Sequence, residues 1–140
     1  MVPGEDRSYR LSDDVEFLCE GIDHRTLDPV KPSSAKAKGR NLQNWIRKLL
    51  IEQLDIHEED IKTAVMGESG EDIIMARAAR EKFPYSVEAK NVEKLNVWAA
   101  YEQACANCGD YEPLLVMKKN HKKPLVVLDA ETFVKIIKKL

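Results

Sequence analysis

A run of apolar residues at helical spacing constrains the fold of this chain more than any other feature. Leucine, isoleucine and tryptophan recur every three or four residues, at Leu42, Trp45, Ile46, Leu49, Leu50 and Leu54. This period places their side chains on one face of a helix, which we predict from Asn41 to Leu54. The helix is therefore amphipathic, and we expect Trp45 to lie in the core.

Short apolar segments after this helix predict strands. The first runs from Ile61 to Val65, and Ile73 to Met75 continues it after a turn rich in glycine and serine. The segment from Phe83 to Lys90 is the second strand. Pro113 to Leu128 contains two apolar strands around a basic turn, which is the pattern of a hairpin.

Two further helices are predicted by apolar spacing. One follows the second strand, with Leu95, Val97, Trp98, Tyr101 and Ala104 as its apolar positions. The other runs from Thr132 to Leu140 and is capped by the segment Asp129 to Glu131. The order helix, strand, strand, helix, strand, strand, helix predicts the α/β class, with a mixed central β-sheet flanked by helices.

The chain of 140 residues suits a single domain, which we place at residues 34–140. Residues 1–33 form an acidic segment, in which Ser12 could cap a short helix from Asp13 to Cys19. This segment is either a partly ordered tail, or it packs on a neighbouring protomer or shields a basic groove. The rest of the chain is correspondingly positive, so the net charge of -2 does not exclude nucleic acid as a partner.

Nothing in the sequence indicates a membrane or secretory protein. No apolar run approaches the ~20 residues of a membrane span, and the N-terminus lacks the features of a signal peptide. We therefore expect a cytoplasmic protein. The odd number of cysteines argues against a disulfide framework. Cys105 and Cys108 have the spacing of half a zinc site, but reduced, ordinary thiols are the preferred interpretation.

Two basic clusters are candidate DNA-backbone contacts. Lys36, Lys38 and Arg40 lie in a flexible lead-in to the first helix, and the hairpin turn supplies Lys118, Lys119, Lys122 and Lys123. Solvated charge is the alternative for both clusters. Arg77 and Arg80 could also meet phosphate, although a solvent-facing role is preferred for them.

Two carboxylates and an ammonium group are predicted to meet at one point. Asp72 begins an apolar segment directly after the glycine-rich turn, and the next strand carries Glu88 and Lys90 two residues apart, hence on one face. Paired carboxylates with substrate phosphate are the ligands that Mg²⁺ prefers. Either Glu68 or Glu71 could join such a site, and strand alternation favours Glu68. The alternative is a solvated strand face with an ordinary Glu–Lys pair.

These residues resemble the motif of the PD-(D/E)XK nuclease superfamily. Asp72, the tripeptide Glu88-Ala89-Lys90 and Gln103 on the following helix carry the resemblance, which covers roughly Ser34 to Phe133. The run Phe83 to Asn91 is most similar to phage-encoded members related to Holliday junction resolvases. The resemblance implies a restriction-endonuclease-like core in a phage-encoded protein that acts in the host cell.

The same resemblance implies a divalent-metal-dependent DNA endonuclease. Asp72, Glu88 and the carbonyl of Ala89 would bind Mg²⁺ or Mn²⁺, Lys90 would position the attacking water, and Gln103 would orient the nucleophile or Lys90. It also implies branched DNA as substrate and a homodimer. Related enzymes often carry a metal-assisting glutamate on the first helix, where this chain has Gln43.

Two alternatives remain open at this point. One is another phage nuclease of the same superfamily: a nickase, a DNA-degrading enzyme or a repair enzyme. The other is a non-catalytic module that binds DNA or protein.

Overall fold

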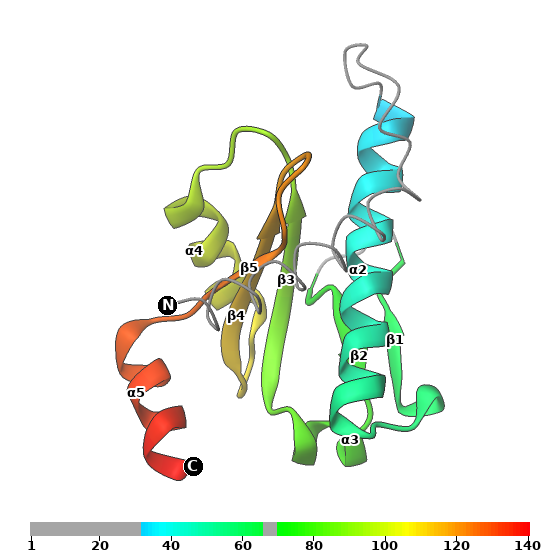
Figure 1. The fold of residues 1–140 in the computed structure, drawn as a ribbon. Coiled ribbons are helices and arrows are strands. Elements are labelled where there is room, and N and C mark those ends of the chain that lie inside the picture. The colour runs from blue at the N-terminus through cyan, green and yellow to red at the C-terminus, as the bar shows by residue number, and fades with distance from the viewer. Residues whose placement is uncertain (1–31, 66–69) are drawn as a thin grey trace, which may run out of the picture.

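The computed structural model describes residues 32–65 and 70–140 (Figure 1). The elements follow in the order α2 (Pro32–Leu54), η1 (Glu58–Asp60), β1 (Ile61–Thr63), β2 (Ile73–Met75), α3 (Arg77–Lys82), β3 (Tyr85–Asn91), α4 (Val97–Asn107), β4 (Glu112–Lys118), β5 (Leu125–Val127) and α5 (Ala130–Lys139). The helix expected from Asp13 to Cys19, the acidic segment up to Lys31, and Glu68 lie outside the described residues.

The described strands form a mixed sheet and a smaller antiparallel one. The mixed sheet has the order β3-β4-β5, with β3 and β4 parallel and β4 and β5 antiparallel. Strands β1 and β2 pair with each other, and the amide of Asp72 donates to the carbonyl of Val87 (2.9 Å), which joins the two sheets. The predicted α/β class with a mixed sheet is confirmed. The single strand expected across residues 61–75 is instead the antiparallel pair β1 and β2.

Helix α2 begins earlier than its apolar spacing predicts. It starts at Pro32, so the segment expected to be a flexible lead-in is helical. Proline suits the first position of a helix, and the alternating alanines and lysines from Ala35 to Lys38 have high helix propensity. Lys36, Lys38 and Arg40 therefore lie on the first turns of α2.

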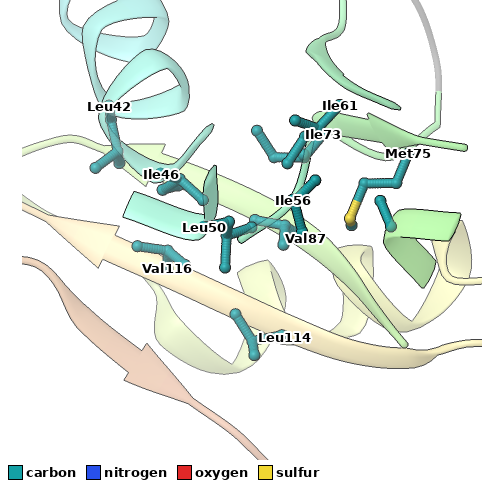
Figure 2. Packing of buried hydrophobic residues seen from close by; sticks show 11 residues of the cluster. Leu42, Ile46, Leu50, Ile56, Ile61, Ile73, Met75, Val87, Leu114 and Val116 are labelled. Atoms are coloured by element: carbon teal, nitrogen blue, oxygen red, sulfur yellow. The ribbon is translucent and has the colours of Figure 1, made fainter. Parts of the chain in front are cut away.

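The core lies between α2 and the sheet. Figure 2 shows the side chains of Leu42, Ile46 and Leu50 from α2 lying over Val87 of β3 and Val116 of β4. Alternation along the paired strands puts Val87, Leu114 and Val116 on this one face. Trp45 packs against the same cluster and is partly buried, in agreement with the predicted amphipathic helix.

The remaining elements follow the sequence pattern closely. Helix α4 crosses between the parallel strands β3 and β4 on the opposite face of the sheet from α2 (Figure 1). The hairpin of β4 and β5 forms as predicted, and Asp129 caps α5 by accepting from the amide of Thr132 (2.9 Å). Among the described helices, none is long and apolar enough to cross a membrane.

Candidate active site

A partly buried ion pair holds the segment that presents Asp72. Gly70 has a φ of 110°, in the left-handed region that glycine adopts without a steric penalty. The next residue, Glu71, pairs with the guanidinium of Arg80 on α3, which also donates to the carbonyl of Tyr85 (2.8 Å). Arg80 is buried and stacks on the ring of Tyr111. It is therefore a structural anchor, and both sequence interpretations of it, as a phosphate contact or a solvent-facing residue, are wrong.

Glu88 is the most enclosed carboxylate of the site. Only 3% of the residue is exposed, and both carboxylate oxygens have partners. Its Oε2 lies 3.2 Å from the Nζ of Lys90, and its Oε1 accepts from the Nδ2 of Asn107 on α4 (3.5 Å). A buried carboxylate needs such partners because its charge is poorly solvated. The common direction of Glu88 and Lys90 on β3 follows from strand alternation, as expected.

Asp72 reaches the same strand from the other sheet. Its Oδ2 accepts from the amide of Ala89 (2.7 Å), so Asp72 and Glu88 flank one backbone unit of β3. Burial raises the pKa of Asp72 to about 6; the negative charge of Glu88 also raises it, whereas the Ala89 amide and Lys90 oppose the shift. The structure thus brings Asp72, Glu88 and Lys90 together from two segments.

The donor set fits a hard divalent cation. The backbone groups of one strand residue point the same way, and the amide of Ala89 faces Asp72, so its carbonyl faces that side as well. Two carboxylates and a carbonyl can hold Mg²⁺, which commonly binds one or two carboxylates and keeps several waters. In the described residues, no three His, Cys, Asp or Glu side chains gather as a metal cluster, so water and substrate would supply the other ligands.

Gln103 does not contact this group directly. It is exposed on α4, and its side chain makes no hydrogen bond to Glu88 or Lys90 in the described part of the chain. Asn107, four residues later on the same helix face, makes the contact with Glu88. Because α4 runs back along β3, Gln103 lies one turn nearer the end of the strand that carries Lys90. The spacing of four residues from Gln103 was the one feature of the sequence that could have indicated a role for Asn107, and Asn107 was not predicted.

At the position on the first helix where a metal-assisting glutamate was considered, this chain has an uncharged glutamine. Gln43 is buried on α2, three and seven residues before the core residues Ile46 and Leu50. It lies on the helix face that packs on the sheet. Within the residues described, the carboxylates of the site therefore come from β3 and from the turn before β2, with none from α2.

Two basic segments, the beginning of α2 and the hairpin turn, lie at the end of the sheet where Lys90 lies. The Nδ2 of Asn91 donates to the carbonyl of Lys38 (3.3 Å), which sets the beginning of α2 beside the end of β3. Asn91 is paired with Lys118, so the hairpin turn extends from this same end (Figure 1). We call the set the basic edge, and it comprises Lys36, Lys38, Arg40, Lys119, Lys122 and Lys123.

Lys118 differs from the other lysines of the hairpin. It is buried, and its Nζ donates to the carbonyl of Lys119 (3.1 Å). Alternation turns it toward α2, on the same face as Asn91 and Val116. This geometry does not support the predicted phosphate contact by Lys118, whereas Lys119 and Lys122 are exposed.

The hairpin turn is tied to the loop after β3. The amide of Asn120 donates to the Oε2 of Glu93 (2.6 Å), across the gap between the turn and the β3–α4 connection. The turn closes with the amide of Lys122 donating to the carbonyl of Lys119 (3.2 Å). The lysines of the turn thus have a defined position relative to β3.

Local structure accounts for several other polar residues. His57 caps the short helix η1 through its Nδ1, which accepts from the amide of Glu59 (3.1 Å). Cys105 and Cys108 are free thiols, and the Sγ of Cys108 donates to the carbonyl of Cys105 (3.1 Å). Arg77 is exposed at the start of α3.

Comparison with protein-family models, with curated proteins and with solved structures gave no match to this chain. The functional argument therefore rests on the arrangement of the side chains.

Proposed function

We propose that this protein is a divalent-metal-dependent DNA endonuclease that hydrolyses phosphodiester bonds, with branched DNA such as a four-way junction as its substrate. One observation carries the proposal: Asp72, Glu88 and Lys90 converge from two segments at the end of the sheet that also bears the basic edge. The sequence resemblance to phage resolvase-like nucleases supports the same function.

The residues take distinct roles in this proposal. Asp72 and Glu88, with the carbonyl of Ala89, would hold Mg²⁺ or Mn²⁺. The bound cation would supply Lewis-acid polarisation of the scissile phosphoryl group. The Nζ of Lys90 lies 3.2 Å from the Oε2 of Glu88, so it would donate to an attacking water or to a phosphate oxygen that lies beside this carboxylate. Gln103 would orient the nucleophile or Lys90 from α4.

The basic edge would hold the DNA backbone. Phosphate contacts supply affinity without reading sequence, and the basic edge consists of lysine and arginine side chains on two separate elements. A substrate read by backbone shape is consistent with such a surface. Binding and chemistry would then depend on different residues.

Cleavage of a labelled four-way junction and of the matching linear duplex tests this function. Wild type, Asp72→Asn and Glu88→Gln are compared in Mg²⁺, Mn²⁺ and EDTA. We expect metal-dependent nicks in the junction, and a loss of about 10³-fold or more in either variant. DNA affinity in EDTA should stay within about twofold of wild type, because the phosphate contacts are elsewhere.

Glu102→Gln, which removes an exposed carboxylate of α4, is the matched control and should cleave normally. Equal cutting of both DNAs would mean that the protein is a general nuclease without selectivity for junctions. Binding without cleavage in either metal would overturn the enzyme in favour of a non-catalytic module.

A further inference from the structure

The end of α4 carries two free thiols three residues apart, and Asn107 lies between them. Cys105 is exposed and Cys108 is partly buried. The backbone of Cys108 is still helical, with a φ of -80° and a ψ of -19°, and Gly109, at a φ of 57°, follows the helix. The two cysteines therefore belong to one helical turn at the surface of the protein.

The geometry of this turn suits a disulfide. Cα atoms three residues apart in an α-helix are separated by about 5 Å, inside the range of about 4.4–6.8 Å found across disulfides. Helical side chains lean toward the beginning of the helix, which directs the side chain of Cys108 back toward Cys105. The Sγ of Cys108 accordingly donates to the carbonyl of Cys105 (3.1 Å).

Formation of the bond must tighten the turn. Cβ atoms three residues apart on a helix are separated by about 5–6 Å, whereas a disulfide needs about 3.5–4.5 Å. The end of α4 must therefore move by roughly 1–2 Å. This end is weakly bonded, because the amide of Cys108 donates to the carbonyl of Cys105 over a long distance (3.4 Å).

Asn107 carries this movement to Glu88. The cysteines lie to one side of the helix face that Asn107 and the buried Ala104 turn to the sheet, so a bond between them draws the turn sideways. The distance of 3.5 Å from the Nδ2 of Asn107 to the Oε1 of Glu88 is already long for a hydrogen bond. A movement of 1–2 Å breaks it and leaves a buried carboxylate oxygen without that donor.

We propose that Cys105 and Cys108 form a reversible disulfide by exchange with a small disulfide such as oxidised glutathione, and that this bond withdraws Asn107 from Glu88. One cysteine thiolate attacks oxidised glutathione and releases a glutathione thiolate. The other cysteine thiolate then attacks the mixed disulfide and releases the second glutathione. The two cysteines are oxidised to one disulfide, the glutathione disulfide is reduced to two thiols, and the two cysteine protons pass to these thiols through solvent.

The surroundings of Cys105 set the conditions for this exchange. Partial burial raises the pKa of its thiol, and so do four neighbouring groups: Cys108, Asp129, Glu102 and Glu112. The thiolate is the reacting form, so exchange should become faster as the pH rises, and a pH of about 8.5 is suitable for the test.

Thiol trapping tests the disulfide. The full chain with Cys19→Ser keeps Cys105 and Cys108 as its two cysteines. It is equilibrated in EDTA with mixtures of reduced and oxidised glutathione, alkylated and weighed by mass spectrometry. We expect one transition from two labels to none. With Cys108→Ser added, the matched control, the protein should carry one label or one glutathione. Two labels at every glutathione ratio would overturn the disulfide.

NMR of the side-chain amides tests the consequence for Asn107. Its resonances, identified by their loss in Asn107→Asp, should shift on oxidation and should not shift when Cys108→Ser is present. Asn96 caps the other end of α4 by accepting from the amide of Ala99 (3.1 Å), so its resonances are the internal control and should stay in place. Unchanged Asn107 resonances in the fully oxidised protein would overturn the coupling. A shift of Asn96 as well would replace it with unfolding of the whole helix.

The effect on cleavage rests on the proposed nuclease function. Asn107 would act there as a positioning residue for Glu88, and loss of such a partner typically costs about 10–100-fold. Oxidised protein should therefore cut the junction at least about tenfold more slowly than reduced protein, and dithiothreitol should restore the rate. Equal rates in the two forms would overturn this regulation. The trapping and NMR experiments need neither DNA nor metal, so failure of the nuclease function is a separate result.

Discussion

The region around Asp72 and the helix α5 differ in which side chains they bury. The first encloses charged groups, and the second leaves apolar residues exposed. Around Asp72, three charged side chains are buried or half-buried and have partners: Glu71 pairs with Arg80, and Glu88 contacts Lys90 and Asn107. At α5 the charged groups are solvated and the apolar residues are exposed. The first region satisfies these charged groups within one chain, whereas α5 leaves large apolar side chains exposed.

This difference indicates where each region obtains its stability. Buried polar groups near β2 are held by specific partners, so removing one partner leaves the other unsatisfied. The apolar residues of α5 contribute little until another surface covers them. Substitutions in the two regions should therefore differ in size, and in one case in sign.

The largest contrast concerns charged residues. Arg80→Leu leaves the carboxylate of Glu71 without its partner and should lower the free energy of unfolding by about 3–5 kcal/mol. Lys135→Leu, at an exposed position of α5, should change it by less than about 0.5 kcal/mol. Urea unfolding measures both values.

The double variant Glu71→Gln with Arg80→Leu removes both charges and should lose less than Arg80→Leu alone. Equal losses in the single and double variants would mean that packing on Tyr111, and not the ion pair, makes Arg80 important.

A second contrast concerns isoleucines. Ile73 is fully buried, so Ile73→Ala should cost about 2–5 kcal/mol through lost burial and the remaining cavity. Ile137→Ala should cost less than about 0.5 kcal/mol in the monomer, because the side chain is half exposed. Urea unfolding at low protein concentration compares them, and a large effect of Ile137→Ala there would show that α5 is packed on its own chain.

The third contrast is one of sign, and it concerns two aspartates. The pKa of Asp72 is raised from 3.8 to about 6, chiefly by burial, so the folded state binds more protons between these values. Its contribution to stability is full below about pH 4 and is lost as the pH rises through 6. Asp72→Asn, in EDTA, should abolish this loss, which is on the order of 1 kcal/mol after allowance for partial solvation.

Asp129 should behave in the opposite way. Hydrogen bonds from the amide and the hydroxyl of Thr132 lower the pKa of its carboxyl. Its stabilising effect is present above the ordinary pKa of an aspartate and is lost as the pH falls through the lowered value. Thermal unfolding of Asp72→Asn and Asp129→Asn from pH 3 to 8 should show slopes that deviate from wild type in opposite directions.

The smallest effect is expected at the basic edge. Lys119→Gln should weaken DNA binding modestly and reduce the slope of log affinity against log salt by about one. Lys62→Gln, at an exposed lysine of β1, is the control. Binding titrations in EDTA at several salt concentrations measure the slopes, and an unchanged slope for Lys119→Gln would remove the hairpin turn from the DNA contact.

Much of the fold follows from local patterns in the sequence. Helical spacing identified the core face of α2, strand alternation put Glu88 and Lys90 on one side, and Asp129 was recognisable as a helix cap. Each of these depends on residues within a few positions of one another. The approach of Asp72 to β3 was inferred from the glycine-rich turn, and the contact with Ala89 agrees with it.

Features that depend on distant partners were not predictable in this way. The burial of Arg80 depends on Glu71, Tyr85 and Tyr111 meeting around it. The contact of Asn107 with Glu88 depends on how α4 lies against β3. The extension of α2 to Pro32 is local in origin, but the polar, basic composition there concealed a favourable helix propensity.

The bond between Asn120 and Glu93 has a mechanical consequence. It connects the tip of the hairpin to the loop that leaves β3, the strand that carries Lys90, through a bond from the Asn120 amide to the Glu93 carboxylate. If the proposed nuclease function holds, this connection would favour a set distance between a DNA strand bound at the tip and the reacting groups. In such an enzyme, the position of the DNA backbone at the hairpin tip would determine which phosphate reaches the reacting groups and is cut.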